Sequence, residues 1–145
     1  MQKPFNGSEW YNKMIESRTL EALRRENADA AARYEAMSRE ELLEVIRLRA
    51  EELGCVPSMT EVAGAAFIAE RYGNWRTALR EAGLGWPEGS PAMQHSRRYK
   101  AEYARQQEQY RAERAEKLQR RREKRQEREE RKAAEAAAAE KPQEK

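Results

Sequence analysis

Residues 38–86 read SREELLEVIRLRAEELGCVPSMTEVAGAAFIAERYGNWRTALREAGLGW, and helix-start and helix-stop signals divide this stretch. Ser38, followed three residues later by Glu41, is a capping box, in which both side chains satisfy backbone amides at a helix start. Apolar residues then recur at three- and four-residue steps, as one helix face requires: Leu42, Val45, Ile46, Ala50 and Leu53. Gly54 is expected to end this first helix, because glycine adopts the left-handed conformation at low cost.

Two shorter helices are predicted after Gly54. Ser58 and Glu61, just after Pro57, form a second start signal, and the helix that they begin is expected to run to Gly73. Its apolar positions are Val62, Ala65, Phe67, Ile68 and Tyr72. Asn74 is expected to cap a third helix. That helix has one apolar face and glycines just past its end: Trp75, Ala78, Leu79, Ala82, then Gly83 and Gly85. The stretch therefore predicts a three-helix domain near the lower size limit for independent folding.

The segment before this centre also predicts a helix. Residues 8–37 have a helix-forming composition, with a thin stripe at four-three spacing: Leu23, Asn27, Ala30, Tyr34 and Met37. We expect this stripe to pack on the central segment or on a partner helix, and so to enlarge a small core. The expected organisation is an N-terminal helical segment over 1–37, the three-helix domain over 38–86, and a third segment over 87–145.

The C-terminal segment predicts one long helix. After Ser90 and Pro91, a cap followed by a first-turn proline, nothing breaks the helix before Pro142. A helix over residues 92–139 would be about 72 Å long. Because no large apolar residue follows Leu118, we expect it to bury no face and to depend on helix propensity and i,i+4 charge pairs. The tyrosines near its start are expected to dock on the globular part rather than stack on bases: Tyr99, Tyr103 and Tyr110.

The composition of the 145 residues agrees with an all-α protein. Charged residues make up 38% and hydrophobic residues 39%, and the mean hydropathy is −1.17, so a single core through the whole chain is excluded. No apolar stretch is long enough to span a bilayer, and the first residues lack the apolar run of a secretory signal. These features predict a cytoplasmic protein without a membrane partner.

Chemistry-bearing residues are scarce. One cysteine and one histidine, Cys55 and His95, allow neither a disulfide within the chain nor a Cys/His zinc site. We expect Cys55 to be buried as a small hydrophobic residue. There is no glycine-rich phosphate loop and no Ser/His/Asp set. The sequence therefore predicts no catalytic residues, no metal, no cofactor, no small-molecule substrate and no enzyme activity.

The net charge of +3 hides an asymmetry along the chain. Residues 1–96 contain 12 Lys and Arg against 15 Asp and Glu, whereas 97–145 contain 17 against 11 and the stretch 97–125 alone has 12 against 5. Such a basic tail is typical of polyanion binding. The candidate residues are Arg120, Arg121, Arg122, Lys124 and Arg125. The alternative is a solvated helix whose charges only keep it soluble. A membrane-surface helix is disfavoured, because no apolar face opposes these charges.

Four strings in the centre carry a family resemblance: AEELG at 50–54, Pro57-Ser58, RYGNW at 71–75 and ALREAGL at 78–84. In these the chain resembles the homing endonuclease associated repeat family, over about 47 of its 145 residues. The resemblance implies a helix-turn-helix-like DNA-binding unit that accompanies a nuclease or another protein of a phage or mobile element. It implies that Ser58–Tyr72 and Asn74–Ala82 are paired helices and that the second enters the major groove. The exposed side chains of that helix would be Arg76, Thr77 and Arg80, unless these arginines are simply solvated.

The chain departs from that family in two respects. It has one copy of the repeat and no nuclease signature. Residues 38–86 contain six arginines and eight glutamates, a net charge of −2, whereas duplex affinity depends on neutralising phosphates. The basic segment 97–125 is expected to supply that charge. The leading hypothesis is thus a non-enzymatic DNA-binding accessory protein, with RNA left open. The alternative is a protein–protein interaction module in which the long helix is a spacer or docking rod.

Overall fold

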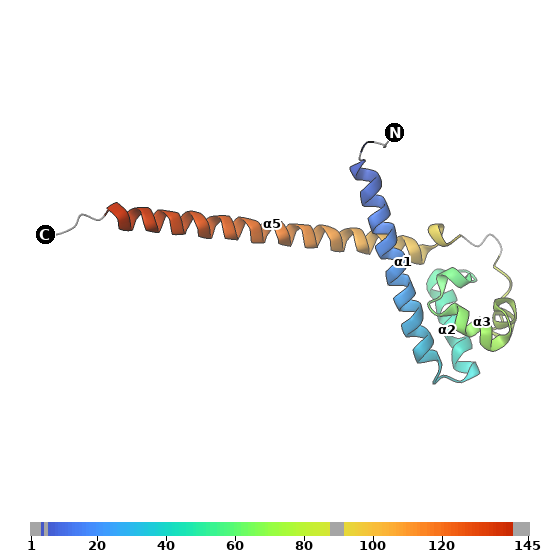
Figure 1. Cartoon of the computed structure of the whole chain (residues 1–145). Helices are drawn as coiled ribbons and strands as arrows, with labels where there is room; N and C mark the ends of the chain where they lie inside the picture. Colours follow the sequence, from blue (N-terminus) through green and yellow to red (C-terminus); the bar gives the residue numbers. More distant parts are fainter. Residues whose placement is uncertain (1–3, 5, 88–91, 141–145) are drawn as a thin grey trace. The chain divides into compact units, whose positions relative to one another are not determined.

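The predicted all-α fold is confirmed by a computed structural model, which describes residues 4, 6–87 and 92–140, without the side chain of residue 94 (Figure 1). The helices are α1 (Gly7–Tyr34), α2 (Arg39–Leu53), the 3-10 turn η1 (Met59–Glu61), α3 (Ala65–Tyr72), α4 (Trp75–Glu81), the 3-10 turn η2 (Met93–His95) and α5 (Arg97–Glu140). The chain forms two compact units, over residues 1–106 and 107–145. The first ten residues of α5 thus belong to unit 1 and the remainder to unit 2.

Local capping positions the helices of unit 1, and the Ser38 half of the predicted capping box is present. The Ser38 hydroxyl accepts a hydrogen bond from the Glu41 amide at 3.2 Å, and Gly54 ends α2 at a φ of 71°. The Asn74 side chain accepts from the Thr77 amide at 2.7 Å and starts α4. The cap of α1 is Asn6, whose side chain accepts a hydrogen bond from the Ser8 amide at 3.1 Å.

The core of unit 1 joins the end of α1 to α2, α3 and α4. Its buried members from α1 are Ala30 and Tyr34, both on the stripe that the spacing predicts. Its other members come from residues 42–82: Leu42, Leu43, Ile46, Val62, Ala65, Ile68, Ala69, Tyr72, Trp75, Ala78, Leu79 and Ala82. The Tyr34 hydroxyl also donates to the carbonyl of Ala63 at 2.7 Å. The expectation that α1 enlarges a small central core is therefore confirmed.

One predicted helix is wrong, because residues 58–72 do not form a single helix. The chain makes the turn η1, breaks at Gly64 with a φ of 70°, and only then begins α3. The break brings the backbone at Gly64 against the Tyr34 ring, where a Cβ atom would lie 2.6 Å from Cε2 of that ring. Ser58 makes no capping hydrogen bond to the backbone, and its hydroxyl instead lies 2.9 Å from that of Thr60.

Glu61 caps a different helix from the one that the sequence predicts. Its carboxylate is buried and accepts from the backbone amides of Arg97 at 3.1 Å and Arg98 at 3.3 Å, at the start of α5. The Arg49 guanidinium lies 3.8 Å from the same carboxylate. A negative charge at a helix N-terminus is favourable, since it satisfies free amides and opposes the helix dipole. Glu61 therefore joins η1 to the first turn of α5 inside unit 1.

The first turns of α5 also differ from expectation. The helix begins at Arg97, five residues later than predicted. The Ser96 hydroxyl caps it by accepting a hydrogen bond from the Tyr99 amide at 3.0 Å. The predicted cap at residues 90 and 91 lies outside the described residues. It also buries a face in unit 1 after all: Arg98, Tyr99, Glu102 and Gln106. Most of that face is polar, which is why hydropathy did not reveal it. The Arg98 guanidinium donates to the Asn27 side chain at 2.8 Å.

Two further residues show how the side chains near α5 are placed. Tyr99 is buried and stacks on Tyr103 with ring centroids 6.0 Å apart, so the docking predicted for the first of the tail tyrosines is confirmed. Cys55 is exposed, which corrects the prediction that it is buried. It follows Gly54 in the turn after α2, where its sulfur accepts from the Arg97 guanidinium at 3.3 Å.

Candidate nucleic-acid interface

Helices α3 and α4 form the pair that the family resemblance places at a duplex. They are joined by Gly73 and Asn74, and α4 buries Trp75, Ala78 and Leu79. The Trp75 indole donates to the carbonyl of Pro57 at 3.3 Å. Because one face of a seven-residue helix is fixed inward in this way, the positions between its buried residues must face outward.

Two of the three predicted α4 side chains face outward. Arg76 and Arg80 are exposed, and Thr77 is half-buried beside the helix cap. The two arginines are four residues apart, so they lie on the same side of α4 about 6 Å apart along its axis. The Arg76 guanidinium carbon lies 5.4 Å from the centroid of the exposed Trp86 ring.

Four of the six arginines of residues 38–86 have no carboxylate partner among the described residues; three lie on α3 and α4, and the fourth is the first residue of α2. Among the described residues, no ion pair involves Arg39, Arg71, Arg76 or Arg80. Instead Arg39 lies over the Tyr72 ring at 4.6 Å from its centroid, and Arg71 lies over the Phe67 ring at 4.9 Å. A guanidinium that stacks on a ring keeps its N–H donors in the plane, where they can still bind an anion.

The remaining two arginines of residues 38–86 are already neutralised on α2. Arg47 pairs with Glu40 at 2.8 Å and also donates to the carbonyl of Ala82 at 3.0 Å. Arg49 pairs with Glu52 at 2.9 Å. The negative net charge of this stretch therefore belongs largely to α2 and to the buried carboxylate of η1. Residues 65–82, which span α3 and α4, carry three arginines against two glutamates.

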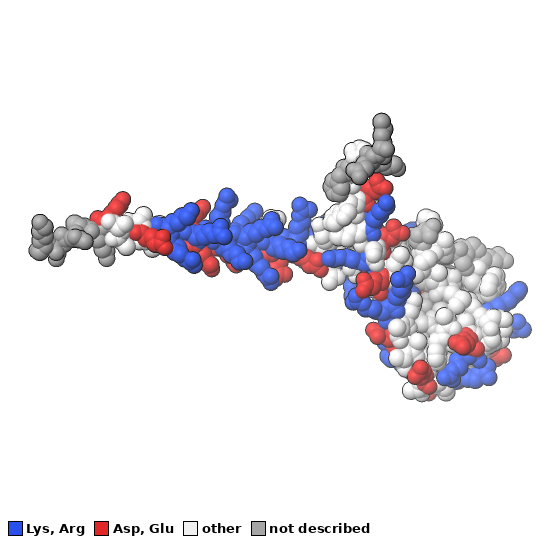
Figure 2. All heavy atoms as spheres, viewed as in Figure 1, with Lys and Arg blue, Asp and Glu red and all other residues white. Residues whose placement is uncertain are grey.

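The predicted tail residues lie in unit 2, and all of them are exposed. Each residue of an α-helix is rotated by about 100° from the one before it. When residues 111–132 are sorted by this angle, they divide into two faces of equal size. Eleven residues lie within about 160° of each other. We call them the basic face of α5: Arg111, Arg114, Lys117, Leu118, Arg121, Arg122, Lys124, Arg125, Arg128, Glu129 and Lys132. Figure 2 shows Lys and Arg gathered along this stretch of α5.

The opposite side holds the other eleven residues of 111–132, which we call the acidic face. Its charged members are Glu113, Glu116, Glu123, Glu127 and Glu130 with Arg120 and Arg131. Arg120 pairs with Glu116 at 2.6 Å, so one predicted binding residue lies on the acidic face and is engaged there. The other four predicted tail residues lie on the basic face. Sequence reasoning missed five more: Arg111, Arg114, Lys117, Arg128 and Lys132. A helical wheel would have found them.

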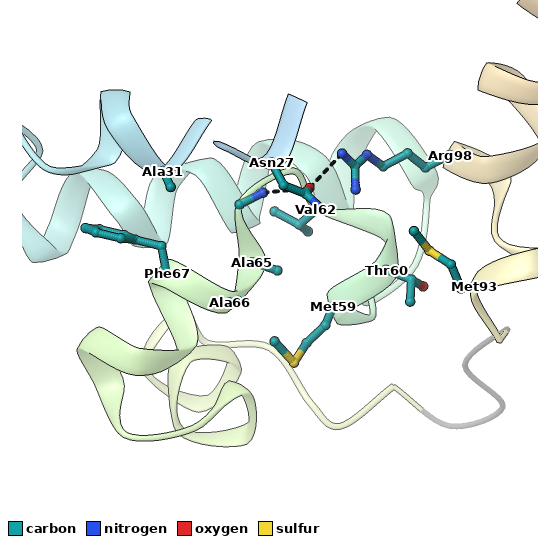
Figure 3. Close-up of a pocket in the computed structure, with 11 residues that line it drawn as sticks. Asn27, Ala31, Met59, Thr60, Val62, Ala65, Ala66, Phe67, Met93 and Arg98 are labelled. Atoms are coloured by element: carbon teal, nitrogen blue, oxygen red, sulfur yellow. Dashed lines mark hydrogen bonds between the residues drawn. The ribbon is translucent and has the colours of Figure 1, made fainter. Parts of the chain in front are cut away.

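The pocket drawn in Figure 3 offers little for catalysis. It lies between α1, η1 and α3, with apolar walls that include Val62, Ala65 and Phe67. Figure 3 shows the Arg98 side chain reaching Asn27, whose side-chain oxygen also accepts from the Gly64 amide at 3.2 Å. These polar groups hold unit 1 together. No carboxylate, histidine or cysteine is among the lining residues of this pocket.

Within the described ranges, no group of three or more His, Cys, Asp or Glu side chains is placed to hold a metal ion. A search of the same residues finds no helix both apolar and long enough to cross a membrane. The arginines of α3 and α4 in unit 1 and the basic face of α5 in unit 2 are two separate candidate surfaces.

Comparison with known proteins bears on unit 1. No curated protein and no solved structure matches the chain. A family model does match, over residues 37–85, which include α2, α3 and α4. This segment corresponds to the homing endonuclease associated repeat, and the resemblance predicted from its sequence strings is confirmed.

Proposed function

We propose that this protein is a non-enzymatic accessory protein that binds duplex DNA, with α3 and α4 set against the sugar-phosphate backbone. The family match indicates a DNA-associated accessory module. The observation that carries the proposal further is the set of arginines at α3 and α4 that no carboxylate of the described chain neutralises. On this proposal, Arg76 and Arg80 contact the backbone directly.

The placement of charge in unit 1 supports this orientation. Duplex affinity comes chiefly from lysines and arginines that replace counterions at phosphates, and a paired arginine gives up part of that gain. Arg47 and Arg49 are held by glutamates on or beside α2, so α2 after its first residue, Arg39, is a poor candidate for the contact surface. The rings of Tyr72, Phe67 and Trp86 contact three of the other four guanidinium groups without neutralising them.

The proposal of a non-enzymatic role rests on the composition of unit 1. A hydrolytic or transfer site needs a nucleophile, a general base or a metal close to a pocket. The pocket of Figure 3 has walls of apolar residues around the bonded pair Asn27 and Arg98. A second pocket of unit 1 includes Glu26, Glu52 and Glu61, but these carboxylates lie within ion-pair distance of the Arg49 and Arg98 guanidinium groups. The protein would therefore position or assist another component on DNA, and contribute affinity rather than chemistry.

The test is a titration of the full chain against a random duplex, followed by fluorescence anisotropy, at about 50 and 200 mM salt. Replacing Arg76 and Arg80 with Gln should lower the slope of affinity against salt by about two, one for each phosphate that is no longer neutralised. A matched control replaces Arg24 and Arg25 with Gln, which removes the same charge from the exposed side of α1.

Two outcomes contradict the proposal. Equal losses from both double variants would show that only net charge matters and that α4 is not the contact surface. If the unaltered chain binds no duplex at the lower salt concentration, the proposed binding of duplex DNA is excluded. The long helix would then be better explained as a docking rod for a protein partner.

A further inference from the structure

Unit 2 has a strongly charged surface that the family match does not cover. Its basic face carries nine Lys and Arg with a single glutamate, whereas its acidic face carries five glutamates and two arginines. From this geometry we infer that the basic face of α5, and not the tail as a whole, is a second duplex-binding surface that runs along the phosphate backbone. This inference rests on the proposed nucleic-acid function and deepens it.

The internal contacts of unit 2 leave the basic face available. Hydrogen bonds on the acidic face join residues one turn apart: Gln119 to Glu123 at 3.3 Å, Arg120 to Glu116 at 2.6 Å, and Gln126 to Glu130 at 3.4 Å. Within the described residues of this unit, the cations of the basic face make no ion pair. The acidic face thus stabilises the helix, while the basic face holds nine cations and one glutamate, a net charge of +8.

The dimensions of the basic face suit a duplex. From Arg111 to Lys132 the helix rises about 32 Å, close to one turn of B-form DNA. A duplex presents roughly 19 phosphate charges over that length. The major groove admits an α-helix, and a face about 160° wide directs side chains to the phosphates on both of its edges. The acidic face would then point away from the duplex.

Two other occupants fit less well. The acidic face of a second copy offers a net charge of −3 against +8 on the basic face, so pairing of two copies would leave most of the positive charge uncompensated. A membrane surface would require apolar side chains to insert between headgroups, and Leu118 is the sole large apolar residue between 111 and 132. A phosphate backbone carries enough negative charge for the whole basic face and requires no apolar side chains, because charge alone provides the affinity.

The test separates the position of charge from its amount, with matched variants of the full chain. Replacing Arg121 and Arg125 with Gln removes two cations from the basic face, and replacing Arg120 and Arg131 with Gln removes two from the acidic face. The first variant should lower the salt slope of duplex binding by about two and the second should leave it unchanged. Circular dichroism at 222 nm confirms that both variants keep the helix.

A charge permutation makes the test sharper, because it changes neither composition nor net charge. The variant combines Arg121→Glu with Glu123→Arg and Arg125→Glu with Glu127→Arg, which moves two cations to the acidic face and two glutamates to the basic face. It should bind the duplex with a lower salt slope and at least tenfold more weakly at about 50 mM salt, because two phosphates are no longer neutralised.

The outcomes that overturn the inference are specific. Unaltered duplex binding by the permuted chain, or equal losses from the two Gln variants, would exclude a face-specific contact. Sedimentation that shows dimers at low salt, absent after permutation, together with unchanged duplex binding, would assign the face to a second copy instead. The Arg76 and Arg80 variant is measured in parallel. If its binding is normal while the permuted chain is weakened, the proposed role of α4 fails and the inference for α5 stands.

Discussion

Gly64 is the position where the fold of unit 1 is most sensitive to a single added carbon. Its φ of 70° costs an L-residue about 1–2 kcal/mol. A Cβ built there would lie 2.6 Å from Cε2 of Tyr34 and 3.0 Å from Cβ of Ala30. Both neighbours are buried in the core, so overpacking adds about 1–3 kcal/mol. Gly64→Ala should therefore lower the free energy of unfolding of unit 1 by about 2–5 kcal/mol.

Gly54 provides the matched control. Its φ of 71° is nearly the same, but a Cβ atom there meets nothing within 4 Å. Gly54→Ala should thus cost only the backbone term of about 1–2 kcal/mol. The difference between the two variants measures the contact with Tyr34 and Ala30. The Tyr34 ring cannot swing away freely, because its hydroxyl is bonded to the carbonyl of Ala63 at 2.7 Å.

Urea unfolding followed by tryptophan fluorescence measures these values. All three tryptophans lie in unit 1, at residues 10, 75 and 86, and Trp75 is buried in the core. The signal therefore reports on unit 1 and not on the exposed helix of unit 2, which also contributes to circular dichroism. Equal destabilisation by the two Ala variants would refute the reasoning, since it would show that α1 does not press against the break before α3.

Three further predictions concern the contacts that hold unit 1. Burial raises the pKa of Tyr34 above its ordinary value of 10.0. Because Tyr34 ionises at lower pH in the unfolded chain than in the folded chain, the free energy of unfolding should fall as pH rises above 10. Urea unfolding across alkaline pH should show a smaller fall for Tyr34→Phe than for the unaltered chain. Asn74→Ala should cost about 1 kcal/mol by removing the cap of α4, whereas Asn74→Ser should restore most of it in the same assay. Glu61→Gln should cost about 1.5–3 kcal/mol, because only one of the two amides at the start of α5 keeps an acceptor, and faster hydrogen exchange at residues 97 and 98 would locate the loss.

The features that the sequence predicts correctly are local ones. The caps at Ser38 and Asn74 depend on residues three positions away, and both are present. The inward face of α4 follows from helical spacing, which is why Arg76 and Arg80 were correctly placed on the outside. Each of these predictions requires knowledge of only one turn of helix.

The features that sequence reasoning missed depend on distant residues. The break at Gly64 is set by the Tyr34 ring, thirty positions earlier in the chain, and Glu61 caps a helix that begins at Arg97. A Ser-x-x-Glu pattern indicates a capping box when it is considered alone, but here η1 turns the carboxylate toward α5. No pattern within residues 58–61 distinguishes these two outcomes.

The basic face of α5 was missed for a different reason, since it is fully present in the sequence. The predicted tail residues Arg120, Arg121, Arg122, Lys124 and Arg125 are neighbours along the chain, yet adjacent residues on a helix point about 100° apart. Sorting the same charges by angle removes Arg120 from the candidate surface and adds five cations to it.

The same principle explains why net charge misleads for both units. Residues 38–86 sum to −2, although their glutamates lie mainly on α2 and three of the four unpaired arginines lie on α3 and α4. Residues 111–132 sum to +5, although one face carries +8 and the other −3. A duplex encounters one face of a protein at a time, so affinity depends on the charge of that face rather than on the total. Variants that move charge between faces therefore test this protein more directly than variants that only remove it.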